Sequence, residues 1–147
     1  LGQAGAGMHE IEQTIKRESY NSNLRERIHH IKWAATEPLI SLYKYASALF
    51  YASLYEGFGF PLVEAMALGV PIITSDCSSM PEVAGDAALL VDPMDEEAMS
   101  EALSKIITDE DLQKSLVSKG RERVKQFSWE KTAKKYLAVF DRLKQNS

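Results

Sequence analysis

The stretch LYEGFGFPLVEAMALG, residues 54–69, decides the fold of this chain. It contains an apolar segment that we expect to form a helix from Pro61 to Gly69, because proline is favoured in the first turn and glycine after the last. A strand is expected before this helix at Ala48–Ser53, and a second strand, rich in β-branched residues, after it at Val70–Ser75. A strand, a helix and a second strand in this order form the repeating unit of a parallel sheet.

The same alternation continues on both sides of this unit. We expect further helices at about His9–Tyr20, Glu37–Ser47, after Ser79, after Asp95, at 110–126 and after Ser128, and further strands at Arg27–Trp33 and Ala88–Val91. The spacing of Ser79 and Glu82 predicts a capping box. Together the elements predict an α/β fold with an open, doubly wound parallel sheet, truncated at its N-terminus, and a helical C-terminal tail.

Composition and charge narrow the class of protein. The 147 residues are 45% hydrophobic and carry a net charge of −4, which indicates one domain with its own core and argues against nucleic-acid binding. No apolar run reaches the roughly 18–20 residues of a membrane span. The single cysteine, Cys77, favours a reducing, cytoplasmic compartment. Because the chain begins at Leu1, we expect a fragment, with residues 1–8 as a tag or the remnant of a strand.

The loop at residues 56–60 is the predicted ligand site, since ligands bind beyond the carboxyl ends of the strands in such sheets. Gly57 and Gly59 would permit a positive φ and a close approach, and the amides at the helix start would suit a phosphate. Glu56 and Glu64 flank this position, and a carboxylate has two oxygens that can accept from a vicinal diol. The pattern therefore favours a nucleotide sugar. Alternatively, both glutamates only stabilise the helix start, and the residues alone do not choose between these interpretations.

Other chemically notable residues have plainer interpretations. Adjacent His29 and His30 would point to opposite faces of a strand, so we do not expect a shared metal. The basic stretch Lys119–Lys125 is expected to be a solvated helix face, with contact to anionic lipid as the alternative. We expect four aromatic residues to be packing residues rather than a stacking platform: Tyr43, Tyr45, Phe50 and Tyr51.

The segment EGFGFPLVE, residues 56–64, matches a known motif, E-x7-E. The match continues through EAMALGVPIITSD, SSMPEVAGDAALLVDP and FSWEKTA, and it covers about residues 36–140. The chain thereby resembles the C-terminal, donor-binding domain of retaining GT-B glycosyltransferases, known as glycosyltransferase family four. This resemblance implies that residues 1–147 form a single nucleotide-sugar donor-binding domain, the Rossmann-like half of a GT-B fold.

The resemblance also implies roles for matching residues. Glu64 would hold the ribose hydroxyls of the donor, and Glu56 would be the catalytic residue at the donor sugar and its phosphate end. The amides of Gly57, Phe58 and Gly59 would meet the sugar and the diphosphate. Leu62 and Val63 would lie near the diphosphate and the ribose. The loop at 32–36, with Trp33 and Ala34, would frame the nucleobase.

The activity implied is transfer of a hexosyl group from a nucleoside-diphosphate sugar to a glycan or lipid-linked acceptor, with retention of configuration. GDP-mannose is favoured over a UDP-hexose, because the quoted segments look most like those of bacterial and archaeal mannosyltransferases that build surface polysaccharides. No cofactor and no metal are expected. An acceptor-binding N-terminal domain and a diphosphate-neutralising Arg/Lys pair would lie outside this chain, and the last helix would cross back onto that domain. The chain alone should therefore bind donor without turnover.

Two other functions stay open at this point. One is a non-catalytic module that binds a nucleotide sugar, and the other is a different GT-B enzyme, such as a sugar-nucleotide epimerase. Peripheral contact with the inner face of the membrane is a further alternative to a purely cytoplasmic location.

Overall fold

The computed structural model describes residues 13–14, 17 and 27–145. The chain consists of two compact units, Leu1–Leu39 and Ile40–Ser147. In the first unit Gln13, Thr14 and Arg17 are helical. The rest of the helix predicted at residues 9–20, and the predicted tag or strand remnant at 1–8, lie outside the described residues.

The strand predicted at Arg27–Trp33 is absent. These residues form a turn and an irregular segment, in which Ile28 is 40% exposed and Trp33 is 75% exposed. The prediction was wrong because a strand needs a neighbouring strand and a buried face. Charged and histidine side chains interrupt the apolar residues here, so that neither face of the segment is apolar.

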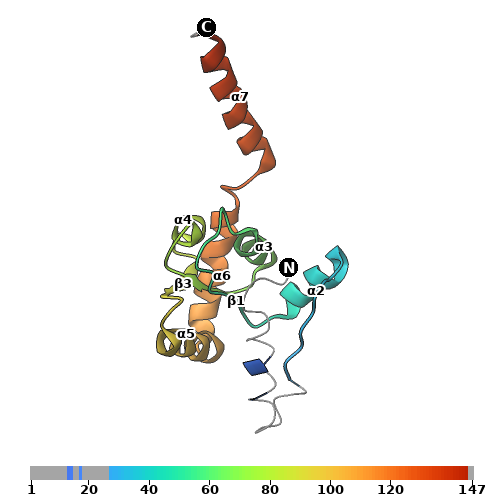
Figure 1. The fold of residues 1–147 in the computed structure, drawn as a ribbon, viewed down its shortest axis with the longest axis vertical. Coiled ribbons are helices and arrows are strands. Elements are labelled where there is room, and N and C mark those ends of the chain that lie inside the picture. Colours follow the sequence, from blue (N-terminus) through green and yellow to red (C-terminus); the bar gives the residue numbers. More distant parts are fainter. Residues whose placement is uncertain (1–12, 15–16, 18–26, 146–147) are drawn as a thin grey trace. The chain divides into compact units, whose positions relative to one another are not determined.

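From residue 36 onward the elements follow the predicted order (Figure 1). They are α2 (Thr36–Tyr45), β1 (Leu49–Tyr51), α3 (Phe60–Leu68), β2 (Ile72–Ser75), α4 (Met80–Ala84), β3 (Ala88–Val91), α5 (Glu96–Thr108), α6 (Glu110–Val124) and α7 (Trp129–Gln145). The boundaries differ from the predicted ones by a few residues, as is usual for element ends.

The three strands of the described part form one parallel sheet in the order β1-β2-β3. Leu49 pairs with Ile72, and Ile73 pairs with Leu89. Every residue of the central strand β2 is buried, as expected for a strand covered on both faces. The predicted α/β fold with a parallel sheet is therefore confirmed.

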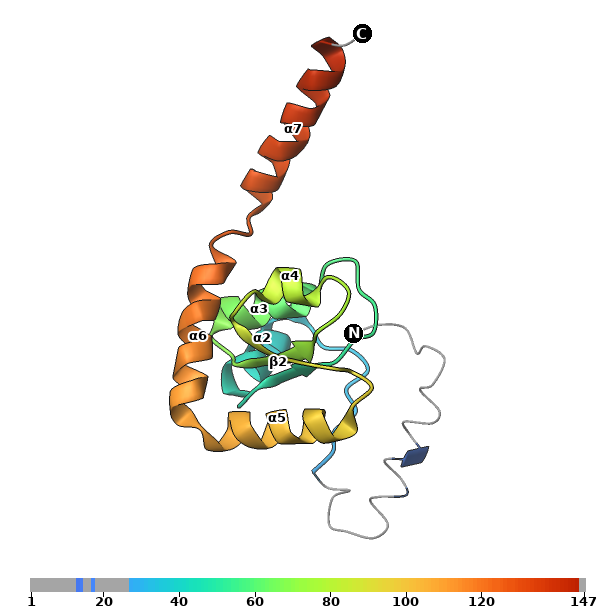
Figure 2. The same cartoon turned by 90° about the vertical axis from the view of Figure 1, so that its left-hand side faces the viewer.

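Helices cover both faces of this sheet, as Figure 2 shows, with α3 and α4 on one side and α5 on the other. Ile72 belongs to the core cluster that includes Leu62 and Met66 of α3, whereas Ile73 packs with Ile106 of α5 on the opposite face. Helix α6 contributes to both clusters. Helices on both faces are the defining feature of a doubly wound sheet.

Helix α3 has termini that fit its sequence. Pro61 lies in its first turn, and Gly69 ends it in the left-handed region with φ 73°, as predicted. Helix α6 approaches α3 closely at Gly120, where a Cβ atom would lie 3.3 Å from the Cγ atom of Met66. The close packing of α6 on α3 holds in place the helix that follows the glycine-rich loop.

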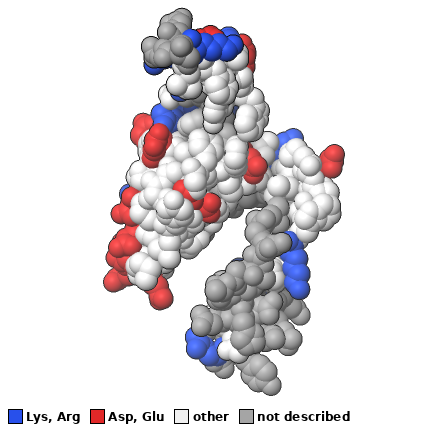
Figure 3. Space-filling view, turned by 45° about the horizontal axis from the view of Figure 1, so that its top comes forward, with Lys and Arg blue, Asp and Glu red and all other residues white. Residues whose placement is uncertain are grey.

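The later helices are capped by side chains. The amide of Ala98 donates to Asp95, and the amide of Lys131 donates to the Oγ atom of Ser128 at 3.1 Å, which confirms the predicted cap. Acidic residues occupy the first turn of α5, and Figure 3 shows acidic side chains gathered along one side of the described surface. Among the described helices, none is both long enough and apolar enough to cross a membrane.

Candidate functional site

The loop between β1 and α3 enters the helix through a residue in the left-handed backbone region. Gly59 has a φ of 96°, and a Cβ atom there would lie 2.7 Å from the Cε atom of Met80. Gly57 differs, because it is not among the described glycines with positive φ, and a Cβ atom there would meet nothing within 4 Å. The expectation of positive φ is thus confirmed for Gly59 and wrong for Gly57, whose surroundings are open.

Several amides at the start of α3 are free to bind a ligand. Within the described residues, the N–H groups of Gly57, Phe58, Gly59 and Phe60 have no protein acceptor, and no side chain caps the helix. The Leu62 amide instead donates to the carbonyl of Gly59 at 3.0 Å. Unpaired amides at a helix N-terminus carry partial positive charge, so the arrangement suits an anion.

Hydroxyl groups at the end of β2 and just after it attach to β1 and to the loop that follows β1. Thr74 and Ser75 donate to the carbonyls of Tyr51 and Ser53, at 2.8 and 2.5 Å. Ser79 donates to the carbonyls of Glu56 and Phe58, at 2.9 and 3.1 Å. The bonds to Ser53, Glu56 and Phe58 pair loop carbonyls that no strand satisfies, and they attach the loop to β2 and to the segment after it.

The capping box predicted for Ser79 and Glu82 is wrong. Ser79 is at the N-cap position of α4 but makes no side-chain cap, because its hydroxyl is used by the loop carbonyls. Ser78 is likewise used there: it donates to the carbonyl of Glu56 at 3.0 Å and accepts from the amide of the same residue at 3.1 Å. Local spacing could not reveal these partners, because they lie more than 20 residues away.

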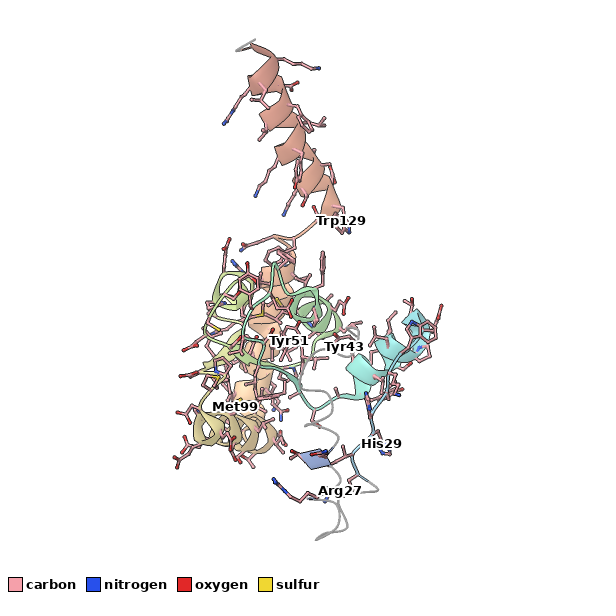
Figure 4. All side chains as sticks on the ribbon, viewed as in Figure 1. Arg27, His29, Tyr43, Tyr51, Met99 and Trp129 are labelled. Atoms are coloured by element: carbon pink, nitrogen blue, oxygen red, sulfur yellow. The ribbon has the colours of Figure 1, made fainter. Side chains whose placement is uncertain are left out.

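Each motif glutamate accepts a hydrogen bond from a tyrosine. The Oε1 atom of Glu56 accepts from the Tyr51 hydroxyl at 2.5 Å and from the Ser53 hydroxyl at 3.1 Å. The Oε2 atom of Glu64 accepts from the Tyr43 hydroxyl at 3.0 Å. Figure 4 labels both tyrosines in the region of α3. The Glu56 carboxylate therefore has a defined orientation in the loop that leads into α3. The Glu64 carboxylate has a defined orientation on the exposed face of α3.

The four aromatic residues predicted to pack have separate outcomes. Tyr43 and Tyr51 do pack against the core, but the sequence did not reveal that their hydroxyls contact the glutamates. For Tyr45 the prediction is wrong, since its side chain is 90% exposed. Phe50 is 39% exposed and belongs to neither core cluster of the described residues. Tyr45 is the last residue of α2 and belongs to neither core cluster of the described residues.

The environment of the two phenols raises both pKa values. Burial raises the pKa of Tyr51 to about 12, and the hydrogen bond to the Glu56 carboxylate acts in the same direction. Burial likewise raises the pKa of Tyr43, followed by its hydrogen bond to Glu64 and by the charge of that carboxylate. Both phenols therefore remain protonated donors throughout the neutral range.

A spectrophotometric titration tests this state. We expect Tyr43 and Tyr51 to ionise above the ordinary tyrosine pKa of 10.0, and Tyr51→Phe to remove one late component of the tyrosinate absorbance. Because the folded pKa exceeds the ordinary value of 10.0, the stability contributed by Tyr51 is complete below that pH and is lost as the pH rises through about 12. A tyrosinate titration of the folded protein that Tyr51→Phe leaves unchanged above pH 10 would contradict the assignment.

The remaining predicted site residues are less directly placed. Leu62 is 0% exposed, so its side chain belongs to the core and offers a ligand no surface. Val63 is half-buried and lines a groove next to the loop. Trp33 and Ala34, the predicted nucleobase residues, lie in the irregular segment of the first compact unit.

The groove beside the loop has a volume of about 750 Å³. Its lining combines loop, aromatic and charged residues, among them Gly57, Phe58, Phe60, Glu82, Arg123, Phe127, Trp129 and Lys135. The rings of Phe60 and Trp129 stack with centroids 6.1 Å apart. Neither motif glutamate lines this groove, so the groove and the carboxylates are separate features of the loop's surroundings.

Arg123 shows that the basic stretch at 119–125 is not simply a solvated helix face. Its guanidinium donates to the carbonyls of Glu82 and Val83 in the last turn of α4, at 2.5 and 3.2 Å. It also lies over the ring of Phe127, with 5.5 Å from its Cζ atom to the ring centroid. A cation at a helix C-terminus is stabilising, so Arg123 fastens α4 to α6. Among the described residues, no cluster of three or more metal-binding side chains occurs.

The contrast between the two loop glycines gives a stability prediction. We expect Gly59→Ala to lower the free energy of unfolding by about 1–2 kcal/mol, because alanine resists a left-handed φ and its Cβ would displace Met80. The matched variant Gly57→Ala should change stability by less than about 0.5 kcal/mol. Urea denaturation of both variants measures the difference, and equal stability of the two would contradict this account of the loop.

Comparisons with known proteins find a matching family and several similar sequences. The family described as glycosyl transferases group 1 matches residues 5–123. The chain is 41% identical over 103 residues to the O-antigen chain mannosyltransferase B of Escherichia coli, an alignment that covers 70% of this chain and 27% of the relative. It is 35% identical over 119 residues to the MMP alpha-(1->4)-mannosyltransferase of Mycolicibacterium hassiacum, covering 78% and 29%.

A solved structure is similar over nearly the whole chain. The sucrose-phosphate synthase of Thermosynechococcus elongatus superposes with a TM-score of 0.83 and 30% identity, covering 99% of this chain and 36% of that one. The chain thus spans less than a third of the two curated relatives named above and about a third of this structure.

Proposed function

Because this chain belongs to the glycosyl transferases group 1 family, we propose that its β1–α3 loop binds a nucleoside-diphosphate sugar for transfer of the hexosyl group. The fold resembles that of GT-B glycosyltransferases. The reaction proposed for the whole protein is transfer to a glycan or lipid-linked acceptor with retention of configuration. Cytoplasmic location, with or without contact to the membrane surface, is part of the same proposal.

One observation carries the proposal: free amides at the start of α3 lie between two oriented carboxylates. The amides suit the diphosphate, and the carboxylates suit hydroxyl groups of the sugar and the ribose. Glu56 leaves the loop next to Gly57, so it is proposed for the sugar end. Glu64 lies one turn into α3 and is proposed for the ribose.

The chemistry follows from where charge develops. As the bond between sugar and diphosphate breaks, negative charge accumulates on the diphosphate, and preorganised amides stabilise it without reorientation. The incoming hydroxyl attacks from the same face, and the departing diphosphate assists removal of its proton. Groups from the rest of the protein would complete the diphosphate site, so the chain alone is proposed to bind donor without turnover.

The proposed sugar is mannose, carried by GDP. Support comes from two relatives that are named mannosyltransferases and are 41% and 35% identical to this chain. A UDP-hexose is the competing donor. The base must be recognised by groups other than the two glutamates, since these are proposed to contact hydroxyls that both nucleotides share.

Calorimetric titration of the chain with GDP, UDP, GDP-mannose and UDP-glucose tests this function. We expect GDP and GDP-mannose to bind, and to raise the unfolding temperature in a concentration-dependent manner. Tighter binding of the uridine compounds would contradict the choice of donor but not the site. Failure of all four compounds to bind at millimolar concentration would contradict the proposed function.

A further inference from the structure

The two motif glutamates share an arrangement that the family match does not explain. Each has one carboxylate oxygen held by a tyrosine hydroxyl: Glu64 by Tyr43, and Glu56 by Tyr51 together with the hydroxyl of Ser53. The tyrosines come from different elements, β1 and α2, and both pack against the core cluster beneath α3. Among the described residues, no partner is seen for the other oxygen, Oε2 of Glu56 or Oε1 of Glu64.

The tyrosines are themselves rigidly placed. Tyr51 is the last residue of β1, it pairs in register with Thr74, and its carbonyl accepts from the hydroxyl of that threonine at 2.8 Å. Tyr43 lies on α2 with its ring against the core. A tyrosine side chain has only two torsions that move its ring. Once the ring is packed, the position of its hydroxyl donor is therefore fixed.

Fixing a glutamate before a ligand arrives has an energetic consequence. A free glutamate side chain loses rotamer entropy when it is immobilised, and this loss would oppose binding. A carboxylate already held at one oxygen has lost most of that freedom in the unliganded protein. Its other oxygen then points in one direction, which selects a single position for the hydroxyl that it accepts from.

We propose that Tyr51 and Tyr43 are positioning residues of the donor site, which orient Glu56 toward the sugar and Glu64 toward the ribose. The inference rests on the proposed function and adds to it two residues outside the glutamate motif. It assigns the Oε2 atom of Glu56 and the Oε1 atom of Glu64 as the ligand-facing oxygens. Because the two tyrosines act on different glutamates, their removal has different consequences for different ligands.

Tyrosine-to-phenylalanine variants separate these consequences. We expect Tyr51→Phe to weaken GDP-mannose binding roughly tenfold while leaving GDP nearly unaffected, because GDP has no sugar for Glu56 to contact. Tyr43→Phe should weaken GDP and GDP-mannose alike, roughly tenfold, because both carry the ribose. Calorimetric titration with these two probes, on the chain as it is, measures the pattern.

Two exposed tyrosines serve as matched controls. Tyr45 lies on the same helix as Tyr43 and is 90% exposed, and Tyr55 precedes Glu56 and is 84% exposed. We expect Tyr45→Phe and Tyr55→Phe to bind both probes as the unaltered chain does. Adding Glu56→Gln to Tyr51→Phe should weaken GDP-mannose binding by less than the two separate losses combined, since a positioning residue acts through its partner.

The outcomes distinguish this inference from the function beneath it. If Glu56→Gln and Glu64→Gln weaken binding but neither tyrosine variant does, the positioning role is overturned and the donor site stands. If Tyr51→Phe weakens both probes equally and also lowers the unfolding temperature, the role is structural and the inference is likewise overturned. If the unaltered chain binds neither probe, the proposed function fails and this inference fails with it.

Discussion

Leu62→Ala is expected to lower the free energy of unfolding by about 3–5 kcal/mol. Leu62 is completely buried, in the cluster where α3 packs on the sheet, together with Met66, Ile72 and Met80. Removing its side chain loses apolar burial and leaves a cavity in this cluster. Urea or guanidinium denaturation, followed by circular dichroism, measures the loss.

Leu54→Ala is the matched control. Leu54 is the same residue type in the preceding loop and is 62% exposed, so its replacement should change stability by less than about 0.5 kcal/mol. If Leu62→Ala were no more harmful than Leu54→Ala, Leu62 would not be the core residue described here. Its assignment as a ligand-contacting side chain would then have to be considered again.

Glu64→Gln is expected to weaken binding of GDP-mannose by about 1.5–3 kcal/mol, the size of a charge-assisted hydrogen bond. Glutamine keeps the length of the side chain and can still accept from Tyr43, but it has one acceptor oxygen and no charge. Because Glu64 is exposed, stability should hardly change. Calorimetric titration at constant ionic strength separates this effect from general screening.

An exposed carboxylate on the other side of the sheet controls for net charge. Glu101 lies on α5, whose residues pack in the second core cluster, and Glu101→Gln changes the total charge by the same amount as Glu64→Gln. We expect Glu101→Gln to leave affinity unchanged. Equal weakening by both variants would mean that overall charge, rather than a contact at α3, governs binding.

Much of the fold was predictable because local signals and tertiary structure agree in this chain. Pro61 and Gly69 mark the ends of α3, and the apolar run at 70–75 becomes the buried central strand. The segment at Arg27–Trp33 was predicted wrongly because strand formation depends on a partner and a buried face, which a short sequence pattern does not reveal. The positive φ of Gly59 was predictable from its position before a helix, whereas the same expectation for Gly57 was not met.

The site was predictable only in part. The E-x7-E spacing identified both glutamates and the glycine-rich loop, because these residues are close in sequence. Their tyrosine partners were not identified: Tyr43 lies 21 positions from Glu64, and its phenol meets the carboxylate only through the packing of α2 near α3. Ser79 was assigned to a local cap for the same reason, since its actual acceptors are loop carbonyls 21 and 23 positions away.

Amide-resolved NMR measures whether the donor's diphosphate meets the amides at the start of α3. The chain, at 16.4 kDa, is small enough for a nitrogen–proton correlation spectrum recorded during titration with GDP-mannose. We expect the amide signals of Gly57, Phe58, Gly59 and Phe60 to shift most, while those of α5 stay in place. Shifts that cluster on α5, or a titration that moves no signal in the loop, would contradict it.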